Sequence, residues 1–166
     1  MLVGVLADTH VRGMGRALPD ELWAAFEGVE AILHAGDLVS LTVLDVLRAH
    51  APTHAVAGNS DGHEVAEVLP ERRVLALGGV RVGLTHGHLG AGRTTPERAL
   101  RQFADEAEPV AVVVFGHSHQ PLIERRGGVL LVNPGSPLDR RSAPRYSCAR
   151  LWLAPGAVEA ELVEWD

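Results

Sequence analysis

The sequence contains no lysine and only one cysteine, Cys148, among its 166 residues. All fifteen basic residues are therefore arginine, which we interpret as an effect of coding composition and not as a functional device. A single cysteine excludes an internal disulfide bond and a zinc–thiolate site. No apolar stretch is long enough to span a membrane. The first apolar run, residues 2–7, has no basic segment before it and leads directly into Asp8, so it predicts a strand and not a signal peptide. We therefore expect a cytoplasmic protein with no membrane partner.

Positive charge is also scarce. The formal net charge is −6, which argues against nucleic acid as a stable partner. The length and the hydrophobic content of 46% fit one domain over residues 1–166. Whether that domain forms a homo-oligomer is left open by the sequence.

Apolar runs separated by turn residues predict an alternating α/β chain. The predicted strands are residues 2–7, 31–35, 54–57, 74–77, 80–85, 110–115, 122–126, 129–132, 146–153 and 158–165. Helices are predicted to begin near Pro19, Ser40 and Thr95, which are favoured cap or first-turn residues. Two Gly-Gly pairs and Pro155-Gly156 predict hairpin turns. Because helices alternate with strands early and hairpins dominate later, we expect two mixed sheets packed face to face with helices outside.

Five of the predicted strands end at residue types that bind metals. The segments are Asp8-Thr9-His10, Gly36-Asp37, Gly58-Asn59-Ser60-Asp61, His86-Gly87-His88 and Gly116-His117-Ser118-His119. Ligands of open α/β sheets bind beyond the carboxyl ends of the strands, so these side chains should converge. Mixed imidazole and carboxylate donors suit manganese, iron, cobalt, nickel or zinc better than calcium or magnesium. A lone Asp or His at a strand end is usually a cap or a turn residue, but five such segments together favour a metal site.

The spacing of the donors suggests how they are shared. Asp8 and His10 are two residues apart in an extended segment, so both side chains can reach one ion. His117 and His119 repeat that spacing. Two ions at short separation need a shared carboxylate, and Asp37 is the natural bridge.

The five segments resemble, in order and chemistry, the motifs of the calcineurin-like metallophosphoesterases. The Val-Asn-Pro-Gly-Ser segment at 132–136 and the short length are similar to the small YfcE-like phosphodiesterases. The resemblance implies a four-layer αββα sandwich of two mixed β-sheets flanked by helices. It also implies two divalent transition metal ions, manganese first with iron, zinc, nickel or cobalt as alternatives. The implied ligands are Asp8, His10, Asp37 and His119 for the first metal, and Asp37, Asn59, His86 and His117 for the second.

By this resemblance the protein is expected to hydrolyse small phosphoesters by in-line attack of a metal-bridging hydroxide. The residues expected to be catalytic are Asp37, Asn59 and His88. Ser60 departs from the pattern, because many larger members have a histidine after the Gly-Asn pair that assists the leaving group. A serine hydroxyl is a poor general acid. His88 and His63 are the candidate substitutes, and the alternative that His88 only supports a metal-binding histidine is left open.

Two alternatives to a phosphodiesterase remain. One is a phosphomonoesterase, and the other is a scaffold that binds protein partners, as the metallophosphoesterase-like subunit of retromer does. Because this chain keeps the whole set of donors, we favour the enzyme.

Four further polar features have expected roles. Asp61 is expected to accept hydrogen bonds and not to bind metal, and His34 to be a packed histidine with a supporting role left open. The Arg140-Arg141 pair and Arg145 are interpreted as a solvated loop, with a phosphate-facing patch as the alternative.

Overall fold

The structure is a computed structural model that describes residues 1–12 and 17–166. The strands are β1 (Leu2–Leu6), β2 (Ala31–His34), β3 (Thr53–Ala55), β4 (Arg72–Leu77), β5 (Val80–Thr85), β6 (Val112–Val114), β7 (Leu122–Arg126), β8 (Val129–Asn133), β9 (Tyr146–Ala154) and β10 (Ala157–Trp165). The helices are α1 (Asp20–Ala25), α2 (Thr42–His50), α3 (His63–Val68) and α4 (Thr95–Arg101). Each predicted strand is present: four are shortened, two keep the predicted bounds and four are longer than predicted.

The strands form two mixed sheets of five strands each, as predicted. One sheet has the order β10-β9-β1-β2-β3, and the other has the order β4-β5-β6-β8-β7. Within the first sheet β1, β2 and β3 run parallel, and β9 and β10 are antiparallel additions. In the second sheet β5, β6 and β8 are parallel, with antiparallel strands at both edges.

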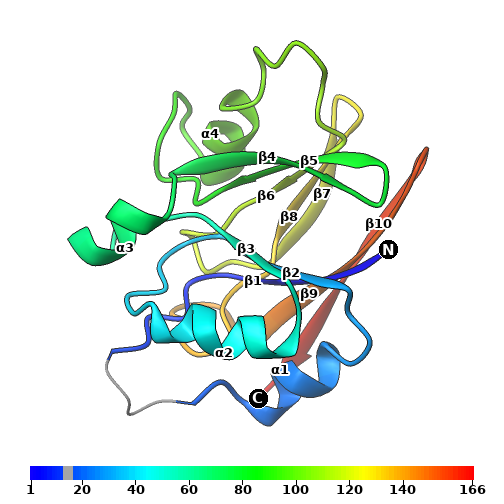
Figure 1. The fold of residues 1–166 in the computed structure, drawn as a ribbon. Helices are drawn as coiled ribbons and strands as arrows, with labels where there is room; N and C mark the ends of the chain where they lie inside the picture. Colours follow the sequence, from blue (N-terminus) through cyan, green and yellow to red (C-terminus); the bar gives the residue numbers. More distant parts are fainter. Residues whose placement is uncertain (13–16) are drawn as a thin grey trace.

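The buried side chains divide into three layers that confirm the predicted αββα sandwich. A central cluster that includes Val5, Leu33, Val82 and Val114 fills the space between the two sheets. A second cluster packs α1, α2 and α3 on the outer face of the first sheet, and a third packs α4 on the outer face of the second. Figure 1 shows α1 and α2 below the two sheets and α4 above them. No helix of the described residues is long and apolar enough to cross a membrane.

The predicted helix starts differ in detail. Pro19 is the N-cap of α1 and not its first residue. Helix α2 begins at Thr42, and Ser40 instead accepts the Thr42 N–H through its hydroxyl at 3.3 Å. Thr94, not Thr95, caps α4, because its side chain accepts the Glu97 N–H. Helix α3 was not predicted, since Val65 is its one buried residue and leaves no helical apolar pattern.

Candidate metal centre

The loops after β1 and β2 lie side by side because the two strands are parallel and in register, with Leu6 opposite His34. The pairing continues past the strand ends. The Asp8 N–H donates to the Gly36 carbonyl at 3.0 Å, and the His10 N–H donates to the Asp37 carbonyl at 3.0 Å. The first two predicted segments therefore meet, as expected for the carboxyl ends of parallel strands.

The backbone at these strand ends is left-handed at residues that are not glycine. Among the described residues, seven non-glycine residues have positive φ, and five of the seven are predicted ligands. They are Asp8, His10, Asp37, His117 and His119, with φ between 46° and 69°. Such a conformation costs on the order of 1–3 kcal/mol at each residue and persists only where the surroundings enforce it. Its concentration here indicates a functional site.

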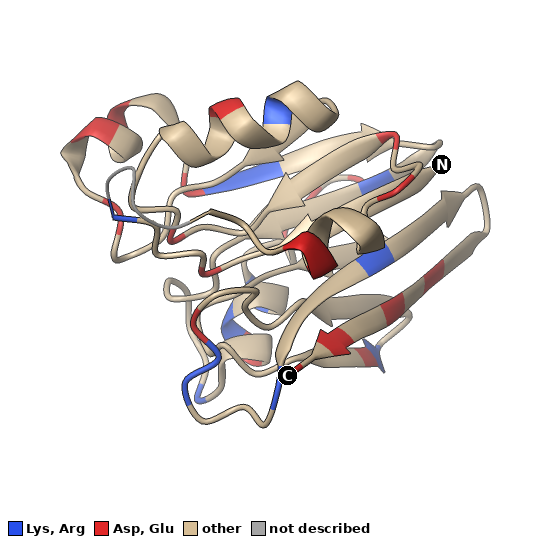
Figure 2. Cartoon of the chain, turned by 90° about the horizontal axis from the view of Figure 1, so that it is seen from below, with Lys and Arg blue, Asp and Glu red and all other residues tan. Residues whose placement is uncertain are grey.

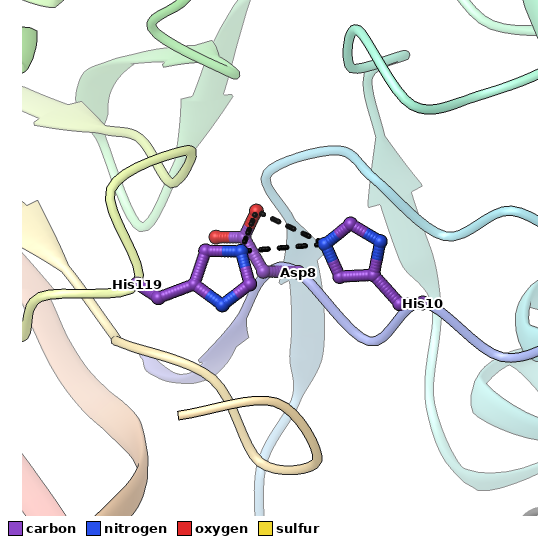
Figure 3. A group of neighbouring side chains, drawn as sticks. All are labelled: Asp8, His10 and His119. Carbon is purple, nitrogen blue, oxygen red and sulfur yellow. Dashed lines mark hydrogen bonds and ion pairs between the residues drawn. The ribbon is translucent and has the colours of Figure 1, made fainter. Parts of the chain in front are cut away.

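Asp8, His10 and His119 form the first donor group. Figure 3 shows the two imidazoles on either side of the Asp8 carboxylate. The Nε2 atoms of His10 and His119 are 3.3 Å apart and lie 4.0 Å and 3.4 Å from Asp8 Oδ1. The Nδ1–H of His119 donates to the Asp139 carbonyl, which leaves the Nε2 of a neutral ring as a lone-pair donor.

Asp8, Asp37 and His86 form the second donor group, and all three are buried. His86 Nε2 lies 3.4 Å from Asp37 Oδ1 and 3.1 Å from the amide oxygen of Asn59. His86 Nδ1 donates to the Ala35 carbonyl at 2.8 Å. Its Nε2 is therefore also free to bind an ion when the ring is neutral.

These donors fit divalent metal ions. Asp8 Oδ1 is buried and has no hydrogen-bond partner among the described residues. Instead it faces the Nε2 atoms of His10, His86 and His119 at 3.4–4.0 Å. Several lone pairs directed at one another in a buried place are stabilised by a cation between them. Imidazole with carboxylate suits a transition metal.

The pKa shifts show the same crowding in the protein without metal. Burial raises the pKa of Asp8 to about 7. Burial also raises the pKa of Asp37, but the hydrogen bond and charge of His86 outweigh it and leave that pKa below its ordinary value. Burial lowers the pKa of His86, yet Asp37 and Asp8 outweigh burial and leave it raised. The pKa values of two neighbouring carboxyl groups are thus shifted in opposite directions, as is common in catalytic sites.

His117 and His88 lie next to the donor groups but outside them. The His117 ring is 5.1 Å from the His86 ring, and burial lowers the pKa of His117 to about 4. The His88 ring is 5.3 Å from the His86 ring. Its Nδ1 is buried without a partner in the part of the chain that the structure describes. Both imidazoles therefore face the space beside the second group.

Comparisons with known proteins agree with this geometry. The sequence model of the calcineurin-like phosphoesterase superfamily domain matches residues 1–154. The chain belongs to this superfamily. A probable metallophosphoesterase from Methanothermobacter thermautotrophicus is 40% identical over 137 residues, which cover 82% of this chain and 77% of the relative. Phosphodiesterase YfcE of Escherichia coli is 40% identical over 89 residues, 49% of this chain and 42% of the relative.

A solved structure shares the fold over the whole chain. Vps29 from Entamoeba histolytica, in a complex with Zn²⁺, superimposes with a TM-score of 0.72 at 26% identity and covers 100% of both chains. The family match and the metallophosphoesterase relative confirm the predicted resemblance to the metallophosphoesterases.

Asp61 accepts hydrogen bonds from the loops beside the donor groups, as predicted. Its Oδ2 accepts the N–H groups of Asp37 at 3.0 Å and Gly58 at 2.7 Å, and its Oδ1 accepts the Val39 N–H at 2.6 Å. The carboxylate thereby ties the Asp37 loop to the Gly58-Asn59 loop. His34 is fully buried and accepts the Gly36 N–H through Nδ1 at 3.2 Å, so it also supports the Asp37 loop.

His63 and His88 were the candidates to replace the histidine that is absent at Ser60, and the structure favours His88. His63 lies in α3 with 87% of its side chain exposed and its Nε2 3.1 Å from Glu67. Ser60 is exposed, and its N–H donates to Asp37 Oδ1 at 2.8 Å. Among these residues, only the His88 ring packs near the histidines of the site.

The sequence did not predict how the end of β8 and the segment after it hold the site in place. The Ser136 hydroxyl donates to the Asp8 carbonyl at 2.8 Å. The Asn133 amide donates to the Gly116 carbonyl and to Ser118 Oγ, both at 3.0 Å. Asp139 orients His119 through its backbone carbonyl. The motif at 132–136 was the available signal, but a contact made by a backbone carbonyl leaves no mark in residue type.

Proposed function

We propose that the protein is a dinuclear-metal-dependent phosphodiesterase that hydrolyses small phosphate esters. The observation that carries the proposal is the pair of donor groups that share Asp8, whose buried Oδ1 has no hydrogen-bond partner among the described residues. A relative named as a phosphodiesterase supports the reaction class.

Asp8, His10, Asp37 and His119 would hold one ion, and Asp37, Asn59, His86 and His117 the other. Asp37 would serve both, because its Oδ2 lies 3.5 Å from His10 Nε2 while its Oδ1 lies 3.4 Å from His86 Nε2. Asp8 would bind through its buried Oδ1, while its Oδ2 accepts the His117 N–H at 2.9 Å. When bound, the ions would polarise a phosphoryl oxygen and lower the pKa of a water molecule.

The side chains around the donors would orient the substrate. Asn59 contributes a neutral amide and is exposed, so it adds no negative charge against an incoming phosphate. His88 would contact the leaving-group oxygen, since it is half-buried beside the second group and its Nδ1 has no partner among residues 1–12 and 17–166. Replacing His88 by Ala should then lower kcat by roughly tenfold to a thousandfold without changing metal content.

The test is turnover of bis-p-nitrophenyl phosphate and of p-nitrophenyl phosphate, each with Mn²⁺ and with a chelator. A phosphodiesterase should cleave the diester faster, and the chelator should abolish that activity. Faster cleavage of the monoester would instead indicate a phosphomonoesterase. Metal binding without turnover of either compound would favour the scaffold.

A further inference from the structure

Three arginines lie in the turn region before β9, and two of them have evident structural roles. Arg140 donates to two backbone carbonyls of the same turn, at 2.9 Å and 3.1 Å, and its guanidinium lies 5.6 Å from the centre of the Tyr146 ring. Arg145 pairs with Asp166 at 3.2 Å. Both therefore fit the predicted solvated loop.

Arg141 differs because the turn around it is fixed to the metal centre on both sides. The Asp139 carbonyl accepts the Nδ1–H of His119. On the other side, the Gln120 amide donates to Ser142 Oγ at 3.0 Å. Arg141 thus stands between two contacts that join the turn to a predicted ligand and its neighbour.

The charge of Arg141 is only loosely matched within the described residues. Its Nε lies 3.8 Å from Asp139 Oδ2, which is beyond hydrogen-bond distance, and 51% of its side chain is exposed. The same Asp139 oxygen lies 3.9 Å from His119 Nδ1. The guanidinium therefore lies beside Asp139, on the Nδ1 side of His119. Burial raises the pKa of Asp8 and lowers that of His10, and the charge of Arg141 opposes the first shift and adds to the second.

The backbone of Arg141 is also held in an unfavourable conformation. Its φ is 47°, within a turn in which the Ala143 N–H donates to the Arg140 carbonyl at 2.8 Å. Apart from Val39, every other described non-glycine residue with positive φ is a predicted metal ligand. A merely solvated arginine needs no such conformation, whereas strain of this kind is typical of functional sites.

We infer that Arg141 forms a subsite for a second phosphate group of the substrate, one that is not hydrolysed. This inference rests on the proposed phosphodiesterase function. A guanidinium presents a planar fork of N–H donors that matches phosphate oxygens. The net charge is −6, and Figure 2 shows a row of acidic residues along β10. Arg141 is therefore not part of a generally basic protein, so its position beside the donors is specific.

The test compares two substrates that differ only in a distal phosphate. Thymidine 5′-(p-nitrophenyl phosphate) and its 3′-phosphorylated form share the reacting phosphate and the leaving group. For the wild-type Mn²⁺ protein, kcat/KM should be about tenfold higher for the 3′-phosphorylated form, mainly through KM. Arg141→Gln should remove that preference while leaving kcat/KM for the plain diester within about twofold. Arg141→Gly, which also relieves the positive φ, should behave in the same way.

Two matched variants separate recognition from a structural role. Arg145→Gln removes an equally exposed arginine from the same loop and should keep the preference. Asp139→Asn keeps the backbone carbonyl that orients His119, and this variant should also keep the preference for the 3′-phosphorylated substrate. Metal loss in Arg141→Gly, or an equal fall for both substrates, would show that Arg141 only positions His119 and would overturn the subsite. A wild type that cleaves both substrates equally would overturn it as well. No turnover of either substrate would overturn the proposed function and the subsite with it.

Discussion

The hairpin turns and the metal loops both need left-handed backbone, but they obtain it differently. In the turns β4–β5, β7–β8 and β9–β10 every residue with positive φ is a glycine: Gly78, Gly79, Gly127, Gly128 and Gly156. At the metal loops Asp and His adopt the same conformation. Glycine does so without steric cost, whereas Asp and His do not. At the metal loops the protein therefore accepts strain at residues whose side chains are candidate metal donors.

The largest expected effect is at Asp37, where the strained conformation and the shared carboxylate coincide. Asp37→Ala should release at least one metal ion and lower kcat/KM by roughly a thousandfold or more. Elemental analysis and turnover of bis-p-nitrophenyl phosphate measure the two results. Full metal occupancy with undiminished turnover would refute the assignment of Asp37 as the bridge.

Asp61 tests whether the strained loop depends on its support. Asp61→Asn retains the shape but replaces one acceptor oxygen by an N–H₂ group, so one of the three backbone N–H bonds must be lost. We expect kcat to fall by about tenfold to a hundredfold with weaker metal binding. Exposed Asp45 in α2 provides a control, and Asp45→Asn should leave both quantities unchanged. Equal behaviour of the two variants would mean that Asp61 does not hold the Asp37 loop.

Asp8 should make the metal-free protein less stable as pH rises. Its pKa is raised from 3.8 to about 7 by burial, so the folded state favours the protonated carboxyl. That stabilisation is fully present below pH 3.8 and is lost as pH rises through about 7. Relative to Asp8→Asn, the chelated wild type should therefore lose roughly 4 kcal/mol of unfolding free energy over this range. Denaturant titrations at several pH values measure it, and parallel curves for the two proteins would contradict the burial of an unpaired carboxyl.

The smallest expected effects on stability come from one substitution in a hairpin turn and one in a metal loop. Gly128 has a φ of 85°, and an added Cβ would meet no atom within 4 Å, so Gly128→Ala should cost only about 1 kcal/mol through backbone strain. Its activity should be unchanged.

His10→Gly should instead leave the metal-free protein as stable as wild type, or more stable by up to about 1 kcal/mol, while activity is lost. A metal-free His10→Gly protein that is clearly less stable would show that no strain is stored at position 10.

Much of this arrangement could be predicted from sequence, because the residues that set it are local. The Gly-Gly pairs and Pro155-Gly156 marked the three hairpins, and the apolar runs marked the strands. The first two donor segments converged as expected because β1 and β2 are parallel and in register. Helix α3 was missed because it is short and only Val65 is buried.

The features of the site that the sequence did not predict depend on long-range backbone contacts. Ser136 reaches the Asp8 carbonyl across 128 residues of sequence, and Asp139 orients His119 through a carbonyl that any residue type would provide. The left-handed conformation of Asp8 and His119 was not readable either, because tertiary contacts and not residue preference enforce it. For the same reason, the difference between Arg141 and its two neighbouring arginines appears only in the fold.

The most direct test of the central claim is a titration of chelated protein with Mn²⁺, in which binding is followed by calorimetry and turnover of bis-p-nitrophenyl phosphate is measured at each step. We expect two ions per chain, with activity rising as the second ion binds. Full activity at one ion per chain, or turnover that persists with a chelator present, would contradict a dinuclear centre built from these strained loops.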